Sequence, residues 1–430
     1  MTHNCCVSKL FWLCTLFLLS LACTDADPLP NIAFSHHITI VMMPINRGQR
    51  EAYDKMISAF KVQAPDIKVS VKVYEHEQFK ALVERGEYRF SESGDVYFWF
   101  GGIRLNSLAM KGDIADLTEL WHERGWSERF TAAAEGAVTA NNMKFAVPIN
   151  YYQWGVYYRQ SAFDARNLAS IETWEDLLNA CEAFSGQGRA LFTVGTRSPW
   201  SVAGWFDYLN LRINGLAFHQ DLMRGDASYD SPRVHSVFVH WKEALDAGCF
   251  IDSRHEMSWK DALPLMYHDR AAAVLMGNFF VSDVPLKIQD DLLFVPFPVI
   301  NPKVPSYEDA PVDVLVVSKQ SEGDPAVSQF LSFIVESDVL IEMNQTSKKL
   351  SPFRQPYELD NKFMKAGDQL LKNAKGVAQF FDRDTPPEMA KPAMDLMVMF
   401  MNEELTIDEV IYSLEQYRMK VFDKSPVFLP

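Results

Sequence analysis

Apolar and polar residues between positions 37 and 100 alternate between strand and helix periods. The run HITIVMMP at 37–44 is mostly apolar, as in a buried strand, and apolar residues occupy every second position over 67–73. Apolar side chains over 53–60 fall on one face of a helix, and a second helix is expected at 77–85. The strand DVYFWF at 95–100 completes a β-α-β-α-β unit. This order predicts an α/β fold whose sheet has parallel strands.

Helix start signals continue along the rest of the chain. Thr173 precedes a helix with apolar residues over 177–184, and Asp324-Pro325 opens another. Thr406 and Glu409 have the spacing of a capping box. The sequence contains no internal repeat, low-complexity tract or linker rich in Pro, Gly and Ser. We therefore expect domains that are interwoven rather than consecutive.

The amino-terminal residues have the pattern of a secretion signal. Lys9 is followed by a mostly apolar run, Leu10 to Leu21, which is too short to span a bilayer. Ala22-Cys23 and the polar TDADPLP after it resemble a bacterial lipoprotein signal, in which Cys23 is lipidated and becomes the first residue. Ser20 stands where that signal prefers Leu. A plain signal peptide cut nearby without lipid is the alternative.

The net charge excludes some classes of binding partner. Without residues 1–22 the chain has 408 residues, with 40 basic and 56 acidic side chains and a net charge of −16. Such a chain is a poor partner for nucleic acid or an anionic membrane surface.

Beyond Cys23 the chain has only two cysteines, Cys181 and Cys249. A disulfide is one outcome for this pair, but we expect two buried free thiols, because spacing alone says nothing about geometry.

An aromatic cluster at 147–163 is the strongest candidate for function. The segment VPINYYQWGVYYRQSAF places five large rings within eight residues: Tyr151, Tyr152, Trp154, Tyr157 and Tyr158. Flat, rigid and amphipathic side chains suit a ligand platform. For any single ring, packing of a strand face against a core is the simpler interpretation.

The order of several segments resembles a known family over nearly the whole chain after the leader. The segments are GDVYFWFGG (94–102), GDIADLTEL (112–120), FAVPINYYQWGVYYRQSAF (145–163), TWEDLLNACEAF (173–184), SPW (198–200), RAAAVLMGNFF (270–280), FVPFPV (294–299) and VDVLVVSKQS (312–321). Together they resemble the bacterial extracellular solute-binding proteins of family 1, the sugar-binding subunits of ABC importers that include maltodextrin-binding protein. One departure is Tyr158-Arg159, where the family has a tyrosine before asparagine or aspartate.

This resemblance implies a periplasmic-binding-protein (Venus-flytrap) fold of two lobes with a ligand cleft between them. We expect an N-terminal lobe of 31–147 and 297–345 and a C-terminal lobe of 148–296 and 346–430, with crossings near Pro148 and Pro296. The implied function is capture of a sugar or oligosaccharide and its delivery to an ABC permease. The resemblance also implies a monomer, without cofactor or metal, in the periplasm or on the outer face of the cytoplasmic membrane.

Carried over by motif, the resemblance assigns twelve ligand-binding candidates. Aromatic rings would stack on sugar rings, and polar groups would bind the hydroxyls. These hydrogen bonds also discriminate between epimers, because a misplaced hydroxyl leaves buried protein groups without a partner. Trp99 lies at the end of a predicted strand, at the edge where α/β sheets bind ligands. The candidates are Asn46, Arg47, Glu75, Trp99, Tyr151, Tyr152, Trp154, Trp200, Asn278, Phe279, Arg383 and Asp384.

Catalytic motifs are absent from the sequence. It has no HExxH, GxSxG, Walker A loop, paired CxxC or GxGxxG before a helix. His36 and His37 are adjacent in a strand and point to opposite faces, which is wrong for binding one ion. Asp382 and Asp384 are more typical of a solvated turn or helix entry than of ligand contacts. As a glycosidase pair they lack a second strand-end carboxylate of evident partnership. The alternatives to transport are a sugar-sensing receptor subunit and, less supported, a glycoside-active enzyme.

Overall fold

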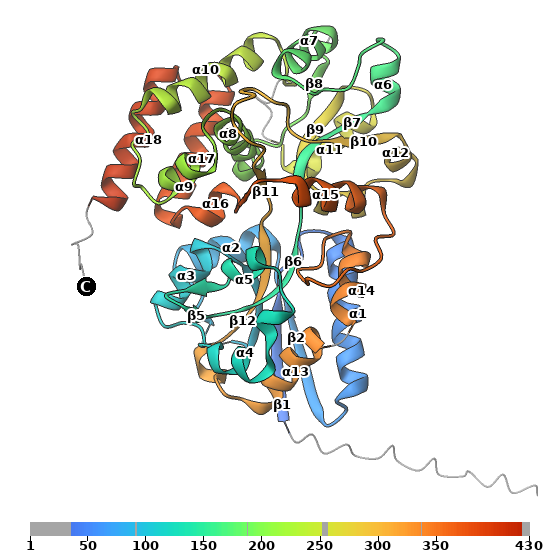
Figure 1. The fold of residues 1–430 in the computed structure, drawn as a ribbon, viewed down its shortest axis with the longest axis vertical. Helices are drawn as coiled ribbons and strands as arrows, with labels where there is room; N and C mark the ends of the chain where they lie inside the picture. Colours follow the sequence, from blue (N-terminus) through green and yellow to red (C-terminus); the bar gives the residue numbers. More distant parts are fainter. Residues whose placement is uncertain (1–35, 91–92, 187, 252–256, 337, 424–430) are drawn as a thin grey trace, which may run out of the picture.

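Two hydrophobic cores divide the protein into two lobes, which lie one above the other in Figure 1. The first lobe's core draws on residues 38–149 and 312–353, and the second lobe's core on 152–297 and 363–414. Each lobe thus joins segments that are far apart in the sequence, as expected for interwoven domains. The computed structural model describes residues 36–90, 93–186, 188–251, 257–336 and 338–423.

The first lobe is built on a mixed five-stranded sheet in the order β2-β1-β3-β12-β6. The predicted parallel unit is confirmed, since β1 pairs in parallel with both β2 and β3. Strand β12 is antiparallel to β3 and to β6, so the sheet is not parallel throughout. The strands are β1 His36–Met42, β2 Ile67–Val73, β3 Val96–Phe100, β6 Val147–Tyr151 and β12 Val312–Val317.

Helices cover this sheet with the faces that the sequence predicted. Helix α1 begins after Asn46, whose side chain accepts a hydrogen bond from Gln49 N, and it buries Tyr53, Met56 and Phe60. A short hairpin, β4 Thr139–Ala140 and β5 Met143–Lys144, precedes β6. The helices are α1 Arg47–Gln63, α2 His76–Glu84, α3 Ile103–Met110, α4 Thr118–Arg124, α5 Ala132–Gly136, α13 Pro325–Glu336 and α14 Val339–Ser347.

The second lobe has a four-stranded sheet in the order β10-β7-β9-β8 and a larger set of helices. Strand β7 is antiparallel to β10 and β9, while β8 is parallel to β9. Helix α8 is buried along nearly its whole length, which makes it the centre of the lobe. The strands are β7 Trp154–Arg159, β8 Ala190–Phe192, β9 Ala271–Gly277 and β10 Leu292–Val295.

The helices around α8 include both predicted capped segments. Thr173 and Thr406 each form a complete capping box, with Asp176 and Glu409 respectively. The helices are α6 Gln160–Asp164, α7 Trp174–Phe184, α8 Pro199–Asn214, α9 Leu216–Met223, α10 Pro232–Asp246, α11 Trp259–Tyr267, α12 Leu286–Asp291, α15 Lys362–Asn373, α16 Phe381–Asp384, α17 Pro387–Met401 and α18 Ile407–Phe422.

Three segments carry the chain between the lobes. Residues 152–153 join β6 to β7, so Pro148 lies inside β6, opposite Val314. Pro296 directly follows β10, and the chain returns to the first lobe at β12 after β11 (Glu308–Asp309) has paired with β13 (Val377–Ala378). The third crossing leads from Phe353 to α15. Figure 1 shows β6 running up from the lower lobe toward the upper one.

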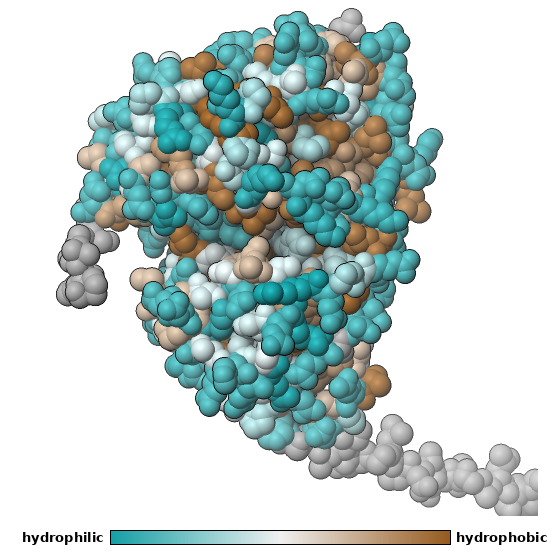
Figure 2. All heavy atoms as spheres, in the orientation of Figure 1, coloured by the Kyte–Doolittle hydropathy of each residue, from teal (hydrophilic) through white to brown (hydrophobic). Residues whose placement is uncertain are grey.

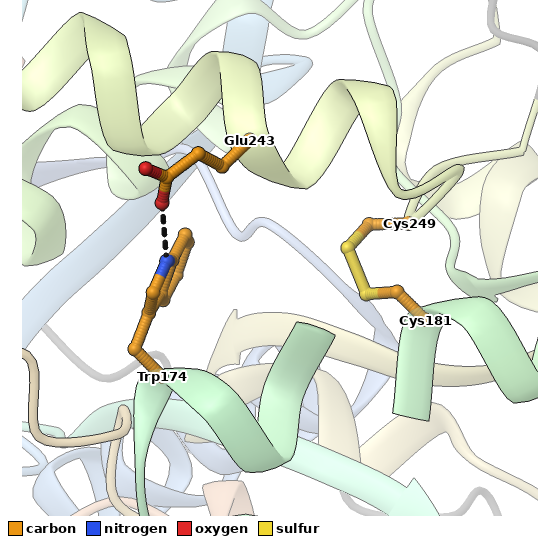
Figure 3. The surroundings of a disulfide bond; sticks show 4 residues. All are labelled: Trp174, Cys181, Glu243 and Cys249. Atoms are coloured by element: carbon orange, nitrogen blue, oxygen red, sulfur yellow. Dashed lines mark hydrogen bonds between the residues drawn. A yellow bond between two sulfur atoms is a disulfide. The ribbon is translucent and has the colours of Figure 1, made fainter. Parts of the chain in front are cut away.

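Cys181 and Cys249 form a disulfide, and the prediction of two free thiols was wrong. Cys181 lies on α7 and Cys249 lies three residues beyond the end of α10, with their Cα atoms 4.5 Å apart (Figure 3). On the same helix faces, Trp174 Nε1 donates to Glu243 Oε2 at 2.9 Å. The packing of these two helices decides the pairing, because a disulfide requires a Cα separation that sequence spacing cannot supply.

The molecular surface is mainly hydrophilic on the face drawn in Figure 2. None of the helices in the described ranges is both long and apolar enough to cross a membrane. The predicted leader and Cys23 lie outside the described residues.

Candidate functional site

Two neighbouring cavities lie between the lobes, and we call them together the cleft. Their shared lining comes from both lobes and from the first crossing: Ile45, His76, Phe100, Tyr152, Phe279 and Arg383. The inner cavity adds Met43, Gln49, Tyr53, Phe98, Trp99, Asp313 and Lys349. The outer cavity adds Lys80, Trp154, Trp200, Phe380 and Asp382.

Aromatic rings of the second lobe form one wall of the cleft. Trp154 stacks on Phe380 with ring centroids 4.4 Å apart, and Trp200 meets Trp154 edge to face at 6.0 Å. Phe279 contacts Trp200 at 5.9 Å. Pro199 starts α8 and places Trp200 in its first turn, while Gly204 one turn later leaves room for the Trp154 ring. The wall therefore offers flat apolar surface beside polar groups.

Arg383 lies at the centre of the polar groups. Its guanidinium lies 4.4 Å from the centroid of the Phe100 ring and donates hydrogen bonds to the Tyr152 hydroxyl at 2.8 Å and to Asp313 Oδ1 at 3.0 Å. Lys349 Nζ binds the other Asp313 oxygen at 2.6 Å. Burial alone would raise the pKa of Asp313, but these two cations outweigh it and lower that pKa. Asp313 is therefore ionised at neutral pH.

Asp382 links the two lobes by ion pairs. It lies on α16 of the second lobe, and its Oδ2 is 3.2 Å from Lys80 Nζ and 3.1 Å from Arg104 Nη2, both in the first lobe. Burial would raise the pKa of Asp382, but Lys80, Arg104 and Arg383 hold it at about 2. Gly102, with φ of 80°, leaves space for α16 at this point, since a Cβ there would lie 2.9 Å from Asp384 Oδ1.

Neutral hydrogen-bond donors also cross between the lobes. Trp200 Nε1 donates to Glu77 Oε1 at 3.2 Å, and Asn46 Nδ2 donates to the carbonyl of Phe279 at 2.7 Å. With these bonds made, each cleft cavity has a volume of only about 30 Å³. That is space for one or two water molecules, not for a sugar ring. The structure is therefore a closed form, and a solute can enter only when the lobes separate.

Six of the twelve predicted ligand-binding residues line the cleft. They come from β3, the first crossing, β7, α8, the turn after β9, and α16: Trp99, Tyr152, Trp154, Trp200, Phe279 and Arg383. Trp99 is buried, packs edge to face on Phe79 and Phe90, and its Nε1 has no hydrogen-bond partner among the described residues. It therefore belongs to the core and lines the cleft at the same time.

The other six predicted residues do not line the cleft cavities. Asn46 caps α1 at the cleft edge, while Arg47 and Glu75 are exposed, the latter as the cap of α2. Asn278 accepts a hydrogen bond from Tyr157 and so supports β9. Tyr151 lines a different cavity, described below.

Asp384, the last of the six, accepts a hydrogen bond from Gln379 N, and burial raises its pKa to about 6. Asp384 is the last residue of α16, which also contains Asp382 and Arg383. Of the two structures expected at Asp382 and Asp384, the helix entry is the one observed, and the Asp382 side chain is buried rather than solvated.

Sequence reasoning missed several charged residues of the cleft. One signal was available for Asp313, because VDVLVV places a lone carboxylate inside an otherwise apolar strand and a buried charge needs partners. Lys80 and Lys349 gave no such signal. Their positions depend on how α2 and the end of α14 approach the cleft.

Comparison with known proteins identifies the family. A sequence model of the bacterial extracellular solute-binding proteins matches residues 46–339. The chain belongs to this family. An uncharacterized ABC transporter extracellular-binding protein of Pyrococcus horikoshii is 22% identical to this solute-binding protein over 383 residues, which cover 87% of each chain.

Solved structures of solute receptors share the fold. The bacterial solute receptor AcbH, whose reported substrate preference is exclusively for β-D-galactopyranose, superposes with a TM-score of 0.84 at 24% identity, covering 90% of this chain and 99% of that one. A chitin oligosaccharide binding protein gives a TM-score of 0.81 at 15% identity, with the same coverage. Both comparisons confirm the two-lobed α/β fold. The family and these neighbours are binding proteins rather than enzymes.

Proposed function

We propose that this solute-binding protein captures a carbohydrate in the cleft and delivers it to the permease of an ABC importer. The observation that carries the proposal is the composition of the cleft, in which aromatic faces stand directly beside fixed charged groups. Sugars present apolar C–H faces and a rim of hydroxyls, so they need both kinds of partner.

The aromatic wall supplies the stacking surface. Trp154 and Phe380 already stack on each other, and Trp200 stands across their edge. A sugar ring entering the outer cavity would lie against Trp200 and Phe279. Tyr152 and Phe100 border both cavities and join this wall to the polar centre.

The polar centre supplies the hydroxyl partners. Asp313 is an ionised acceptor held by two cations, and the Lys349 ammonium and Arg383 guanidinium are fixed donors beside it. His76 adds a ring nitrogen, and burial lowers its pKa so that the imidazole is neutral at pH 7. Groups of both signs occur in near balance, which favours a neutral ligand over a strongly charged one.

Closure is the conformational step of the proposed mechanism. The bonds from Trp200 to Glu77, Asn46 to Phe279, and Asp382 to Lys80 and Arg104 would break as the lobes separate. A carbohydrate that contacts both lobes stabilises the closed state by its differential affinity for it. The closed form then presents the loaded lobes to the permease.

A thermal-shift screen of the purified protein against a carbohydrate panel tests the proposal. A ligand at 100 times its dissociation constant adds about 2.7 kcal/mol to the unfolding free energy, so binding raises the melting temperature measurably. Solution scattering with the same ligand should then show a radius of gyration no larger than that of the free protein. A panel of mono- and oligosaccharides without any shift would refute the carbohydrate assignment.

The same assay separates binding from catalysis. We propose that the ligand leaves the cleft chemically unchanged. Chromatography of the recovered ligand should show a single species after prolonged incubation. Release of reducing sugar from any glycan of the panel would instead indicate a glycoside-active enzyme.

We also propose that the mature protein is lipid-anchored at Cys23, outside the cytoplasm. The leader sequence Leu21-Ala22-Cys23 is the support for this assignment. Mass spectrometry of the membrane fraction should show an acylated terminus and loss of residues 1–22. Cys23→Ser should release the protein from the membrane without unfolding it, and an unmodified terminus elsewhere contradicts the lipoprotein assignment.

A further inference from the structure

A third cavity lies behind the crossing strands, and we call it the hinge cavity. Its volume is about 400 Å³, more than ten times that of either cleft cavity. Its walls come from the start of α5, from the crossings, from the segment 353–359 and from α15. Both lobes therefore contribute to it, although none of its lining residues belongs to the cleft.

Adjacent residues of two paired strands face the hinge cavity and the cleft in turn. Tyr151 lines the hinge cavity while Tyr152 lines the cleft. In the same way Val312 lines the hinge cavity and Asp313 the cleft, and Val312 pairs with Tyr151 in the sheet. Because successive side chains of a strand point to opposite faces, the two spaces lie on opposite sides of the same crossing strands.

This placement couples the two spaces mechanically. The hinge cavity is bounded by α5 of the first lobe and by Asp368 and Leu371 on α15 of the second. When the lobes separate around the crossing strands, the cleft widens and the walls on the other side move together. The hinge cavity is therefore open in the closed form and narrows as the cleft opens. A molecule that fills it opposes opening.

The lining defines the chemistry of the molecule that fits. Phe353, Tyr151 and Tyr357 supply aromatic rings, and the rest of the wall is mainly aliphatic. Among the described residues, three charged side chains line the cavity: Asp368, its ion-pair partner Lys372, and the exposed Arg354. Since Lys372 and Asp368 neutralise each other, the net charge of this lining is +1. An aromatic body with one anionic group matches both features.

We propose that the hinge cavity is an effector site for a small aromatic anion, and that its occupation favours the closed form. The cleft ligand and the effector then strengthen each other's binding by the same factor, because coupling between two sites is reciprocal. The proposal concerns a site that is separate from the cleft. Its first test needs no carbohydrate, so its failure can be distinguished from failure of the transport assignment.

The probe is 1-anilinonaphthalene-8-sulfonate, an aromatic anion whose fluorescence rises in apolar surroundings. Titration of the full chain should give saturable binding at one site per molecule. Leu371→Trp fills the cavity and should abolish this binding. Leu370→Trp is the matched control, because Leu370 is the preceding residue of α15 and does not line the cavity. It should leave probe binding unchanged.

Charge selection is tested with a second pair of measurements. Arg354→Gln removes the one lining cation that has no acidic partner in the cavity wall, where its Nε donates to the carbonyl of Phe130. The change should weaken binding of the sulfonate probe about tenfold, as expected for one charge-assisted hydrogen bond. N-phenyl-1-naphthylamine has the same ring system without the sulfonate, and its affinity should not change in Arg354→Gln. This comparison remains valid if Leu371→Trp fails to fold, which its circular dichroism spectrum will show.

Scattering tests the coupling. Saturating probe should lower the radius of gyration of the wild-type protein, and Leu371→Trp without probe should have a smaller radius than Leu370→Trp. The effector site is ruled out if Leu371→Trp and Leu370→Trp bind the probe equally, or if Arg354→Gln leaves the affinity for both probes unchanged. Tyr412 lies on the exposed face of α18, away from the hinge cavity. If Tyr412→Ser loses probe binding, the probe binds at α18, and the effector site is likewise ruled out. An increase in radius on probe binding contradicts the coupling.

Discussion

Trp200 donates its indole N–H to Glu77 across the cleft, with Nε1 and Oε1 3.2 Å apart. Trp200 belongs to the core of the second lobe, and Glu77 lies on α2 of the first. Burial would raise the pKa of Glu77, but Lys80 and His76 lower it, so the acceptor is ionised at neutral pH. One aromatic residue of the cleft lining thus also joins the two lobes by a hydrogen bond.

Truncation of the cleft tryptophans separates their roles. Trp200→Ala should weaken carbohydrate binding by about 1–3 kcal/mol, the cost of losing one stacked ring. Trp99→Ala should reduce both affinity and stability, because Trp99 packs on Phe79 and Phe90 as well as lining the cleft. Calorimetric titration and thermal melts measure the two effects.

The control is Trp241→Ala, in the core of the second lobe. It should cost about 3–5 kcal/mol of unfolding free energy and leave affinity unchanged. Unchanged affinity in Trp200→Ala would remove Trp200 from the binding site.

Asp382→Asn should shift the free protein toward an open form. The substitution removes the charge that binds Lys80 and Arg104, and we expect a loss of about 1–3 kcal/mol for the closed state. The radius of gyration without ligand should increase. Asp395→Asn is the matched control, since it breaks only the exposed pair with Lys391, and its radius should equal that of wild type. Equal radii for both variants would show that these bridges do not set the closure.

Asp384 should make the protein less stable as pH rises toward neutral. Its pKa is about 6 in the folded state because of burial, against an ordinary value of 3.8. The folded state therefore binds more protons than the unfolded state between these values, and stability decreases through this range, by about 3 kcal/mol in total. The destabilisation by Asp384 is absent below pH 3.8 and has its full, constant value above pH 6.

Asp384→Asn tests this dependence, because the amide oxygen can still accept from Gln379 N but cannot ionise. Urea melts between pH 4 and 7 should show a flatter profile than wild type and higher stability at pH 7. Glu388→Gln changes an acidic residue in the first turn of α17 and should keep the wild-type profile. Parallel profiles for wild type and Asp384→Asn would contradict the assignment.

Breaking the disulfide should destabilise the second lobe. The bond closes a loop of 68 residues between Cys181 and Cys249, for which the chain-entropy account gives about 4 kcal/mol. Both Cys181→Ser and Cys249→Ser should lower the melting temperature to a similar extent. Reduction should destabilise wild type and leave the variants unchanged. An equal loss in the variants on reduction would contradict a single bond between these residues.

Local sequence determined the elements that depend on neighbouring residues. The alternation at 67–73, the helical face at 53–60, the helix cap at Thr173 and the capping box at Thr406 all appear where predicted. These features follow from backbone hydrogen bonding and from burial of one face, and both are properties of short segments. The aromatic cluster at 147–163 divides by position: Tyr152 and Trp154 line the cleft, Tyr151 lines the hinge cavity, and Tyr157 and Tyr158 are buried in the core of the second lobe.

Tertiary structure alone decided which distant groups meet. Lys80, Asp313, Lys349 and Asp382 come from four separate segments. The pair of Lys80 with Asp382 joins the two lobes, while Lys349 pairs with Asp313 within the first lobe. Tertiary packing also sets the distance of 4.5 Å between the Cα atoms of Cys181 and Cys249, and it makes β12 antiparallel to β3 in the sheet. The sequence by itself determined local periodicity and the kinds of side chain available. The distances among those side chains arose from packing between segments that lie 36 to 302 residues apart in the sequence, which no local pattern encodes.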